Sequence, residues 1–301
     1  LTFLKKEFPT VEYFELPSYD ISYGKNLKWS LLLKTITIIR AVKKEQEIIQ
    51  SYIDNTKNIA GIISDNRFGC YSKQLPSVYM THQLNVLSGF LTPILSYFHQ
   101  QIIRKYDECW IPDEENSLFS GKLSRSSKNL HQKYIGVLSR FEKQELPLEI
   151  DVLILLSGPE PNRTQLEDKL KEIFKTSNKR VCLIQGKVEE TQKITQLHQL
   201  KIVNFMLSGE LEHTINSSKI IICRAGYSSI LDIVSLNKEA LLIPTKYQNE
   251  QEYLAKYLQE KGVFSFIEEK DIDKKIVNIS IKPSVTGFKK QEFNTDLFYL
   301  F

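Results

Sequence analysis

The sequence predicts an α/β protein made of two doubly wound domains, and two observations lead to this prediction. Short β-branched and apolar runs alternate with helical periods along most of the 301 residues, which is typical of parallel strands joined by helices. The alternation is interrupted once, by the polar, proline-containing stretch 141–148, and then restarts. A chain of this length also has room for about two domains. We therefore expect a first domain over residues 1–145 and a second over residues 146–301, whose last residues are candidates for a return to the first domain.

The first domain is expected to hold five short strands and two long helices. Apolar and β-branched runs predict strands at 11–16, 59–64, 77–81, 109–111 and 134–137. An apolar stretch predicts a helix from about 86 to 103. A longer helix over 28–53 is predicted because five apolar residues share one face, namely Leu32, Ile36, Ile39, Ile49 and Ile53.

The second domain repeats the alternation more regularly. Strands are predicted at 150–156, 181–184, 202–205, 219–223 and 241–244. The helices expected between and after them cover 164–174, 211–217, 228–236 and 250–262. Ligands of doubly wound sheets bind beyond the carboxyl ends of the strands, so the turns that follow strands are where functional residues are expected.

Composition excludes several classes of protein. A net charge of +4 and 42% hydrophobic residues indicate a globular chain without the strongly basic surface typical of nucleic-acid binding. No run approaches 18 apolar residues and residues 1–6 do not resemble a signal peptide, so we expect a cytoplasmic protein, with peripheral contact at the inner face of the plasma membrane as an open alternative. The first residue is Leu1 rather than Met, which suggests that the chain begins inside a longer protein.

The four cysteines suggest neither a metal site nor a disulfide framework. They are far apart and form no CxxC pair, and two of them, Cys182 and Cys223, lie in apolar runs typical of buried thiols. A reducing compartment and the absence of a bound metal are the expectations.

The turn over 223–232 (CRAGYSSILD) is the strongest candidate for a ligand site. It follows a predicted strand, Gly226 permits a tight backbone, and Ser228 or Ser229 can cap the following helix. The start of a helix attracts anions, and Asp232, one turn further on, can accept hydrogen bonds from sugar hydroxyls. An ordinary capped helix with a solvated Arg224 is the alternative.

Three other turns of the second half carry polar residues. Glu250 and Gln251 lie after the strand at 241–244 and are suited to binding sugar hydroxyls, although a charged first helical turn would look the same. The turn after 150–156 contains Ser157, Gly158 and Arg163. Two prolines remove backbone donors there, which leaves Arg163 to supply charge to a ligand, and a merely stiff turn is the alternative. Arg140, at the domain junction, is either a ligand contact or a salt-bridged surface residue.

Two turns of the first half are expected at one edge of its sheet. Asp65 and Arg67 follow one predicted strand, and His82, Gln83 and Asn85 follow another. All five are candidates for residues on the acceptor side. His82 is a candidate general base because its charge changes near neutral pH, and the alternative is a structural histidine.

Taken in order, these turns resemble those of GT-B glycosyltransferases of family 28, a group that includes the enzyme adding N-acetylglucosamine to the lipid-linked peptidoglycan precursor, and above all those of uncharacterised bacterial members of the group. The similar strings cover about residues 1–265 and are DNRFG at 65–69, PSVYMTHQL at 76–84, YIGVLSRF at 134–141, LSGPEPNRT at 156–164 and IPTKYQNEQEYLA at 243–255. The resemblance implies two Rossmann-like domains.

The resemblance also implies roles for these residues toward a UDP-sugar donor. The residues from Arg224 through Ala225 to Gly226 would begin the donor loop, with Ser228 and Ser229 at the diphosphate and Asp232 at the ribose. Further donor contacts would come from Arg140 and Arg224 at the diphosphate, from Phe205 and Met206 at the uracil, and from Glu250 and Gln251 at the sugar. His82, Gln83 and Asn85 would lie near a lipid- or saccharide-linked acceptor.

Members of the family open with a strand and a GxGH turn, which this sequence lacks. The resemblance therefore implies that the first strand precedes Leu1 and that the catalytic histidine lies there, leaving His82 as the candidate base within this chain. The expected reaction is transfer of a sugar, N-acetylglucosamine or a similar one, with inversion and without a metal. A nucleotide-sugar hydrolase and a non-catalytic nucleotide-sugar-binding protein are the alternatives.

Overall fold

The computed structural model describes residues 2–19, 28–125, 130–278, 281, 288 and 294–301, with only the backbone of 28–36. It divides into two compact units. Residues 1–12 and 139–290 form one, here called the C-unit, and residues 13–138 and 291–301 form the other, here called the N-unit.

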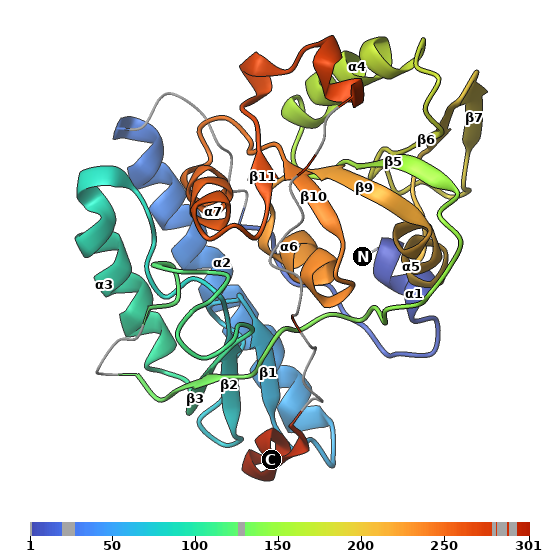
Figure 1. The fold of residues 1–301 in the computed structure, drawn as a ribbon. Coiled ribbons are helices and arrows are strands. Elements are labelled where there is room, and N and C mark those ends of the chain that lie inside the picture. The colour runs from blue at the N-terminus through green and yellow to red at the C-terminus, as the bar shows by residue number, and fades with distance from the viewer. Residues whose placement is uncertain (1, 20–27, 126–129, 279–280, 282–287, 289–293) are drawn as a thin grey trace. The chain divides into compact units, whose positions relative to one another are not determined.

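The C-unit is built on a seven-stranded sheet with the order β11-β10-β9-β5-β6-β8-β7 (Figure 1). The pairs are parallel except β7 with β8, which are antiparallel. The strands are β5 (Ile150–Leu155), β6 (Val181–Ile184), β7 (Ile194–Leu197), β8 (Leu200–Val203), β9 (Ser218–Cys223), β10 (Glu239–Leu242) and β11 (Ser265–Phe266). Their β-branched residues fill the interior of the unit, as expected for a sheet covered on both faces.

Helices of the C-unit connect these strands. They are α1 (Thr2–Glu7), α4 (Asn162–Phe174), α5 (Ser208–Asn216), α6 (Tyr227–Ser235) and α7 (Asn249–Glu260), followed by the 3₁₀ turns η2 (Glu269–Asp271) and η3 (Lys274–Asn278). Leu166, Leu170 and Phe174 of α4 are buried against the sheet at helical spacing.

The chain reverses its direction across the C-unit sheet at β5. It passes from β5 to β6 and β8 on one side, and then crosses back to β9 on the other side of β5. The carboxyl ends of β5 and β9 therefore flank the topological switch point, the position at which doubly wound sheets bind ligands.

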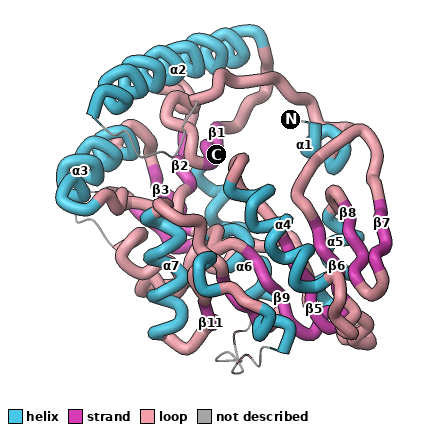
Figure 2. Tube along the Cα trace, turned by 90° about the horizontal axis from the view of Figure 1, so that it is seen from above, coloured by secondary structure: helices cyan, strands magenta, loops and turns pink. Residues whose placement is uncertain are grey.

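The N-unit is built on a four-stranded parallel sheet in the order β1-β2-β3-β4. Its strands are β1 (Ile62–Asp65), β2 (Ser77–Met80), β3 (Glu108–Ile111) and β4 (Gln132–Tyr134), and its helical segments are α2 (Lys28–Asn55), η1 (Gly89–Leu91), α3 (Thr92–Ile103) and η4 (Thr295–Leu300). Figure 2 shows α3 beside β2 and β3, where Ile103 packs with Tyr79 and Cys109. Leu297 of η4 packs with Val78 and Trp110 in a second cluster.

Most predicted elements are present, with shifted ends, but some predictions were wrong. Residues 11–16 form no strand, and Val11, Tyr13 and Phe14 are largely exposed. The strand predicted at 134–137 lies at 132–134, and the helix predicted from 86 begins at Thr92 after a 3₁₀ turn. The short elements α1, β7 and β11 were not predicted because each is too short for a clear period.

The face predicted for the long helix over 28–53 is only partly buried. Ile39 is 62% exposed, whereas Ile49 and Ile53 are half-buried. The side chains of Leu32 and Ile36 lie outside the described residues.

The boundary between the units differs from the predicted one. Residues 139–145 group with the C-unit because Phe141 is buried and two main-chain N–H groups bond to α5: that of Glu142 donates to Glu212 (2.6 Å) and that of Gln144 to Asn216 (3.1 Å). Residues 1–12 also group with the C-unit, and residues 291–301 with the N-unit.

All four cysteines are buried and free, as predicted for Cys182 and Cys223. Burial raises the pKa of the Cys182 thiol to about 11 and that of Cys223 to about 12. Both thiols are therefore protonated near neutral pH and act as small apolar core residues.

Candidate functional site

The start of α6 lies at the switch point of the C-unit sheet, directly after β9. Gly226 is the N-cap residue and no side chain caps the helix. The first N–H groups of a helix have no helical acceptor, so those of Ser228 and Ser229, together with the positive end of the helix dipole, are suited to an anion. The predicted serine cap was wrong, because the helix begins at Tyr227 and places both serines inside its first turn.

Asp232 is on the same face of α6 as the two serines, since residues three and four apart in a helix are neighbours. Its Oδ1 accepts a hydrogen bond of 2.6 Å from the Ser139 hydroxyl, which in turn accepts one from the Phe141 N–H (3.2 Å). Asp232 is half-buried. The carboxylate is thus oriented beside the helix start, and a carboxylate can accept several hydrogen bonds.

Arg224 does not face a ligand, contrary to the prediction that it meets the diphosphate. Its side chain is 1% exposed, and its guanidinium donates to the Glu269 carboxylate (2.7 Å) and to the Asn162 carbonyl (2.9 Å). It also lies 3.4 Å from the carbonyls of Ile243 and Pro244. Arg224 therefore holds the ends of the sheet together, and Ala225 beside it is fully buried.

The turn after β5 presents its backbone rather than its arginine. Ser157 and Gly158 are exposed, and Gly158 has φ +105°, a conformation that favours glycine. Arg163 is 4% exposed and engaged by Glu160, by Glu167 (2.6 Å) and by the Gln185 carbonyl (3.1 Å). The suggestion that Arg163 supplies charge to a ligand was wrong, because these partners satisfy its guanidinium.

The segment after β8 is buried. Phe205 is 6% and Met206 4% exposed. The Phe205 N–H donates to Asn204 Oδ1 (3.0 Å), and its carbonyl accepts from Gln192 Nε2 (3.0 Å). The Phe205 main chain therefore already has partners in this state.

The turn between β10 and α7 is held by two side chains of the helix. Gln251, which is 7% exposed, accepts from the Thr245 N–H (2.9 Å), and Glu252 accepts from the Tyr247 N–H (2.9 Å). Tyr247 has φ +66°, which is unusual for a bulky residue and indicates local strain. Glu250, the other predicted residue, is half-buried in the first turn of α7. Sequence reasoning missed Glu252, although it follows Gln251 directly.

Arg140 remains accessible to solvent. Its guanidinium carbon lies 4.9 Å from the centroid of the Phe141 ring and 6.0 Å from that of Phe3. These distances allow cation–π contacts, which orient the side chain without neutralising its charge. Arg140 follows Ser139, the residue that holds Asp232.

Several buried polar atoms without a hydrogen-bond partner lie at the carboxyl edge of the C-unit sheet. They are Ser208 Oγ after β8, and Thr245 Oγ1 and Gln248 Oε1 after β10. A buried polar atom without a partner is costly and often marks a ligand or water position. This edge is therefore incompletely satisfied by the protein itself.

In the N-unit, the turn after β1 is largely structural. Arg67 pairs with Glu45, whose side chain is fully buried, and its guanidinium lies 4.5 Å from the Tyr19 ring. The same carboxylate accepts from the Gly69 N–H (2.9 Å). The prediction that Arg67 contacts an acceptor was wrong, because it neutralises a buried carboxylate.

Asp65 and His82 follow the adjacent strands β1 and β2 and interact electrostatically. Partial desolvation raises the pKa of Asp65 and the charge of His82 lowers it, with an upward net shift. Asn66 holds the two turns together, since its Oδ1 accepts from Tyr79 (3.0 Å) and its N–H donates to Met80 (3.0 Å). His82 is half-buried.

Gln83 and Asn85 differ in their environment. The Gln83 N–H donates to Thr81 Oγ1 (3.1 Å), so its backbone forms part of the turn. The Asn85 amide donates to the Lys122 carbonyl (2.9 Å) and accepts from Gln100 (3.3 Å). Asn85 therefore fixes a loop, and the prediction of an acceptor contact does not fit its partners.

Glu114, just after β3, is a residue that sequence reasoning missed. Its Oε1 is buried without a hydrogen-bond partner. Burial and the nearby Asp113 raise its pKa, against a hydrogen bond from the Val137 main chain. A raised carboxyl pKa at a ligand-binding edge suits proton transfer. The acidic run 113–115 directly after a strand was the available signal.

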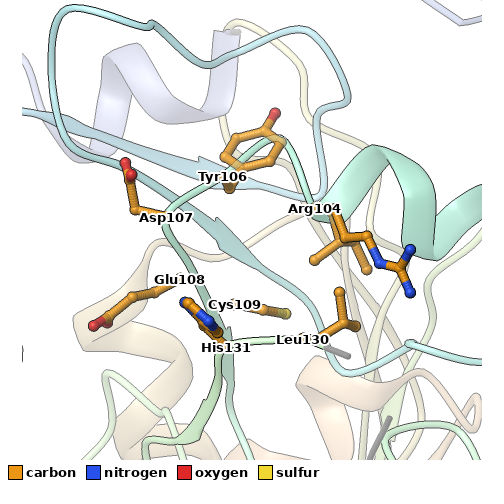
Figure 3. Close-up of a pocket in the computed structure, with 8 residues that line it drawn as sticks. Arg104, Tyr106, Asp107, Glu108, Cys109, Leu130 and His131 are labelled. Carbon is orange, nitrogen blue, oxygen red and sulfur yellow. The ribbon is translucent and has the colours of Figure 1, made fainter. Parts of the chain in front are cut away.

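A separate pocket of about 260 Å³ lies at the opposite edge of the N-unit sheet, where Tyr106 and Asp107 precede β3 and Glu108 begins it (Figure 3). Its carboxylates are already engaged: Asp107 accepts from the Ser77 N–H (2.8 Å), and Glu108 accepts from the Trp110 indole (2.8 Å). None of the residues that line this pocket is among the predicted site residues. Within the described residues, no group of three or more His, Cys, Asp or Glu is placed to hold a metal ion.

Comparison with known proteins defines the class first. Solved structures of GT-B glycosyltransferases share the fold, including a glycosyltransferase of kitacinnamycin (TM-score 0.58, 11% identity, 85% of this chain and 75% of that one). MurG of Acinetobacter baumannii is another (TM-score 0.50, 13% identity, 91% and 75%). The predicted fold class, α/β with Rossmann-like domains, is confirmed.

The sequence comparisons show similarity to glycosyltransferase family 28. Residues 160–295 match the glycosyltransferase family 28 C-terminal domain. UDP-N-acetylglucosamine–N-acetylmuramyl-(pentapeptide) pyrophosphoryl-undecaprenol N-acetylglucosamine transferases are similar along most of the chain. The one from Sulfurihydrogenibium sp. is 23% identical over 97% of this chain and 79% of its own length, and the one from Haemophilus influenzae strain PittEE 24% over 89% and 77%. The predicted resemblance to a family 28 GT-B glycosyltransferase is confirmed, and the protein is a glycosyltransferase.

Proposed function

We propose that this protein transfers N-acetylglucosamine, or a similar sugar, from a UDP donor to a hydroxyl of a lipid-linked acceptor. The similarity to family 28 transferases supports the donor and acceptor classes. The observation that carries the proposal is the uncapped start of α6 at the switch point of the C-unit sheet, with Asp232 on the same helical face.

The C-unit holds the donor in this proposal. The N–H groups of Ser228 and Ser229 and the exposed turn at Ser157 and Gly158 receive the diphosphate, and Asp232 receives the ribose hydroxyls. Phe205 and Met206 border the nucleobase, while Glu250 and Gln251 border the sugar.

The reaction is a single displacement with inversion, without a metal ion. The acceptor oxygen forms a bond to the anomeric carbon as the bond to the UDP oxygen breaks, and the acceptor proton passes to a base. Charge develops on the leaving diphosphate. Prearranged N–H groups at the α6 start and the Arg140 guanidinium would stabilise that charge.

The N-unit supplies the base in this proposal. His82 is the candidate within this chain, with Asp65 beside it as the group that stabilises the imidazolium formed after proton transfer.

A peripheral contact with the inner face of a membrane would bring the enzyme to a lipid-linked acceptor. Four large apolar side chains of η1 and α3 are exposed, namely Phe90 (89%), Ile94 (55%), Tyr97 (59%) and Phe98 (61%). Their spacing places them on neighbouring helical positions. The described part of the chain contains no helix that could span a membrane.

Calorimetric titration with UDP, GDP and dTDP, followed by turnover of UDP-N-acetylglucosamine with a polyprenyl-diphosphate saccharide, tests the proposal. Preferred binding of UDP and transfer that depends on the lipid acceptor are expected. Release of UDP without an acceptor would indicate a nucleotide-sugar hydrolase instead. Binding of UDP without turnover would indicate a non-catalytic binding protein. Lack of UDP binding would contradict the proposal.

A further inference from the structure

The short helix α1 is docked on the C-unit beside α5 (Figure 1). Phe3, Lys6 and Glu7 are half-buried, whereas Leu4 and Lys5 are exposed. Positions three and four apart share a helical face, so α1 contacts the unit through one face only.

Three side chains of α1 fix this face. The Glu7 carboxylate accepts from the N–H of Ser208, the first residue of α5 (3.1 Å). The Lys6 ammonium donates to the Glu190 carbonyl and lies 5.7 Å from the centroid of the Phe205 ring. The Phe3 ring lies 6.0 Å from the Arg140 guanidinium carbon.

Two of the residues that α1 contacts, Arg140 and Phe205, are ones that the proposed function gives to the donor. Arg140 is assigned to the diphosphate, and Phe205 with Met206 to the nucleobase. Phe205 and Met206 are almost fully buried in this state. Glu7 also occupies the main-chain N–H of Ser208 at the start of α5, a donor of the kind that a nucleobase carbonyl oxygen would use.

We propose that α1 is an internal competitor of the donor, occupying the nucleobase end of its site and leaving when the nucleotide binds. This inference rests on the proposed function. The Glu7 carboxylate stands in for a carbonyl oxygen of the base, and Lys6 covers the Phe205 ring. The ligand that displaces α1 is a nucleoside diphosphate or its sugar derivative.

The docking of α1 is suited to release. No residue of α1 is fully buried, and an isolated helix of this length is not stable in water. Next to its Glu7 contact, Ser208 Oγ is buried without a hydrogen-bond partner. This unsatisfied hydroxyl makes the state with α1 docked less stable. The state in which α1 is docked is therefore specific in its contacts but only weakly stable.

Titration calorimetry with UDP on the double variant Lys6→Ala/Glu7→Ala tests the competition. If α1 covers the site most of the time, removing its contacts raises the apparent UDP affinity by the inverse of the open fraction, roughly 5- to 10-fold. Lys5→Ala, an exposed neighbour of the same charge as Lys6, is the matched control and should bind UDP as the unaltered protein does. Unchanged or weaker UDP binding by the double variant would overturn the inference.

Hydrogen exchange of the α1 amides supplies a second readout on the unaltered protein. Adding UDP should accelerate their exchange, because the helix is displaced. Slower exchange would mean that α1 closes over the nucleotide and would contradict competition. If UDP binds without these effects, the inference about α1 is wrong and the proposed function stands. If neither the unaltered protein nor the double variant binds UDP, the result counts against both the inference and the proposed function.

Discussion

The carboxyl edges of the two parallel sheets differ in chemistry although their topology is alike. In the C-unit, the edge presents uncapped N–H groups at α6, an exposed glycine turn and Arg140. Arg163 and Arg224 are instead paired with carboxylates inside the unit. In the N-unit, the edge presents Asp65, His82 and Glu114, and the pKa of both carboxyls is raised.

The difference matches the two tasks of a glycosyl transfer. A leaving diphosphate needs positive potential that is already in place, and an acceptor hydroxyl needs a group that can take a proton. The comparison also separates buried arginines, which stabilise the fold, from Arg140, whose charge is still available. The following predictions test this division.

Gly226→Asp is expected to have the largest effect. A Cβ at Gly226 would meet no atom within 4 Å, and its φ of −78° suits any residue, so the variant should fold. The added carboxylate would repel the diphosphate by about 4 kcal/mol at close range, which corresponds to roughly a thousandfold loss of UDP affinity by calorimetry.

Gly226→Ala is the matched control for that substitution. It adds the Cβ without the charge and should bind UDP nearly as well as the unaltered protein. An equal loss in both variants would mean that the backbone, and not the charge at the helix start, was disturbed.

Arg224→Met should destabilise the C-unit by about 3 kcal/mol, because it leaves the Glu269 carboxylate without its partner. Denaturant unfolding with hydrogen exchange localised to the C-unit measures this. Arg140→Ala should leave stability unchanged and weaken UDP binding instead. A loss of stability in Arg140→Ala with unchanged stability in Arg224→Met would show that the two arginines have the opposite roles.

Glu167 should give the C-unit a sensitivity to acid. Burial alone would raise its pKa, but hydrogen bonds from Lys171, Arg163 and Gln185 outweigh burial and lower the pKa to about 2. The contribution, of the order of 3 kcal/mol, is present above the unfolded pKa of about 4.5 and is lost as the pH falls toward 2. Glu167→Gln should therefore be less stable at pH 7 and lose less stability on acidification; parallel curves for the two proteins would contradict this.

His82→Asn should lower kcat about 100-fold if His82 is the base. UDP affinity should be unchanged, because the donor is assigned to the C-unit. Gln83→Ala serves as a neighbouring control and should retain most of the activity. Unaltered kcat in His82→Asn would transfer the role to another group, with Glu114 the next to test.

Much of the fold could be predicted because hydrophobic periodicity follows burial. The strands β5, β6, β8, β9 and β10 of the C-unit were predicted within a few residues, since runs such as Ile220–Cys223 have few alternatives. Residues 11–16 were misread because an apolar run without a neighbouring strand looks the same in sequence as one that is paired.

The candidate site was predicted only as far as residue type allows. Gly226, Ser228 and Asp232 were placed correctly at a helix start after a strand, because glycine and serine there have few other uses. Arginine is ambiguous: nothing local distinguishes Arg224, bound to Glu269 45 residues away, from an arginine that faces a ligand. The strained Tyr247 and the unpartnered Glu114 oxygen depend on tertiary packing and leave no local pattern.

The central claim, that the start of α6 holds the donor diphosphate, is tested most directly by amide chemical shifts during a UDP titration. The account predicts that the largest changes fall on Gly226, Ser228 and Ser229. Changes confined to Arg104, Cys109 and His131, around the pocket at the other edge of the N-unit sheet, would contradict it.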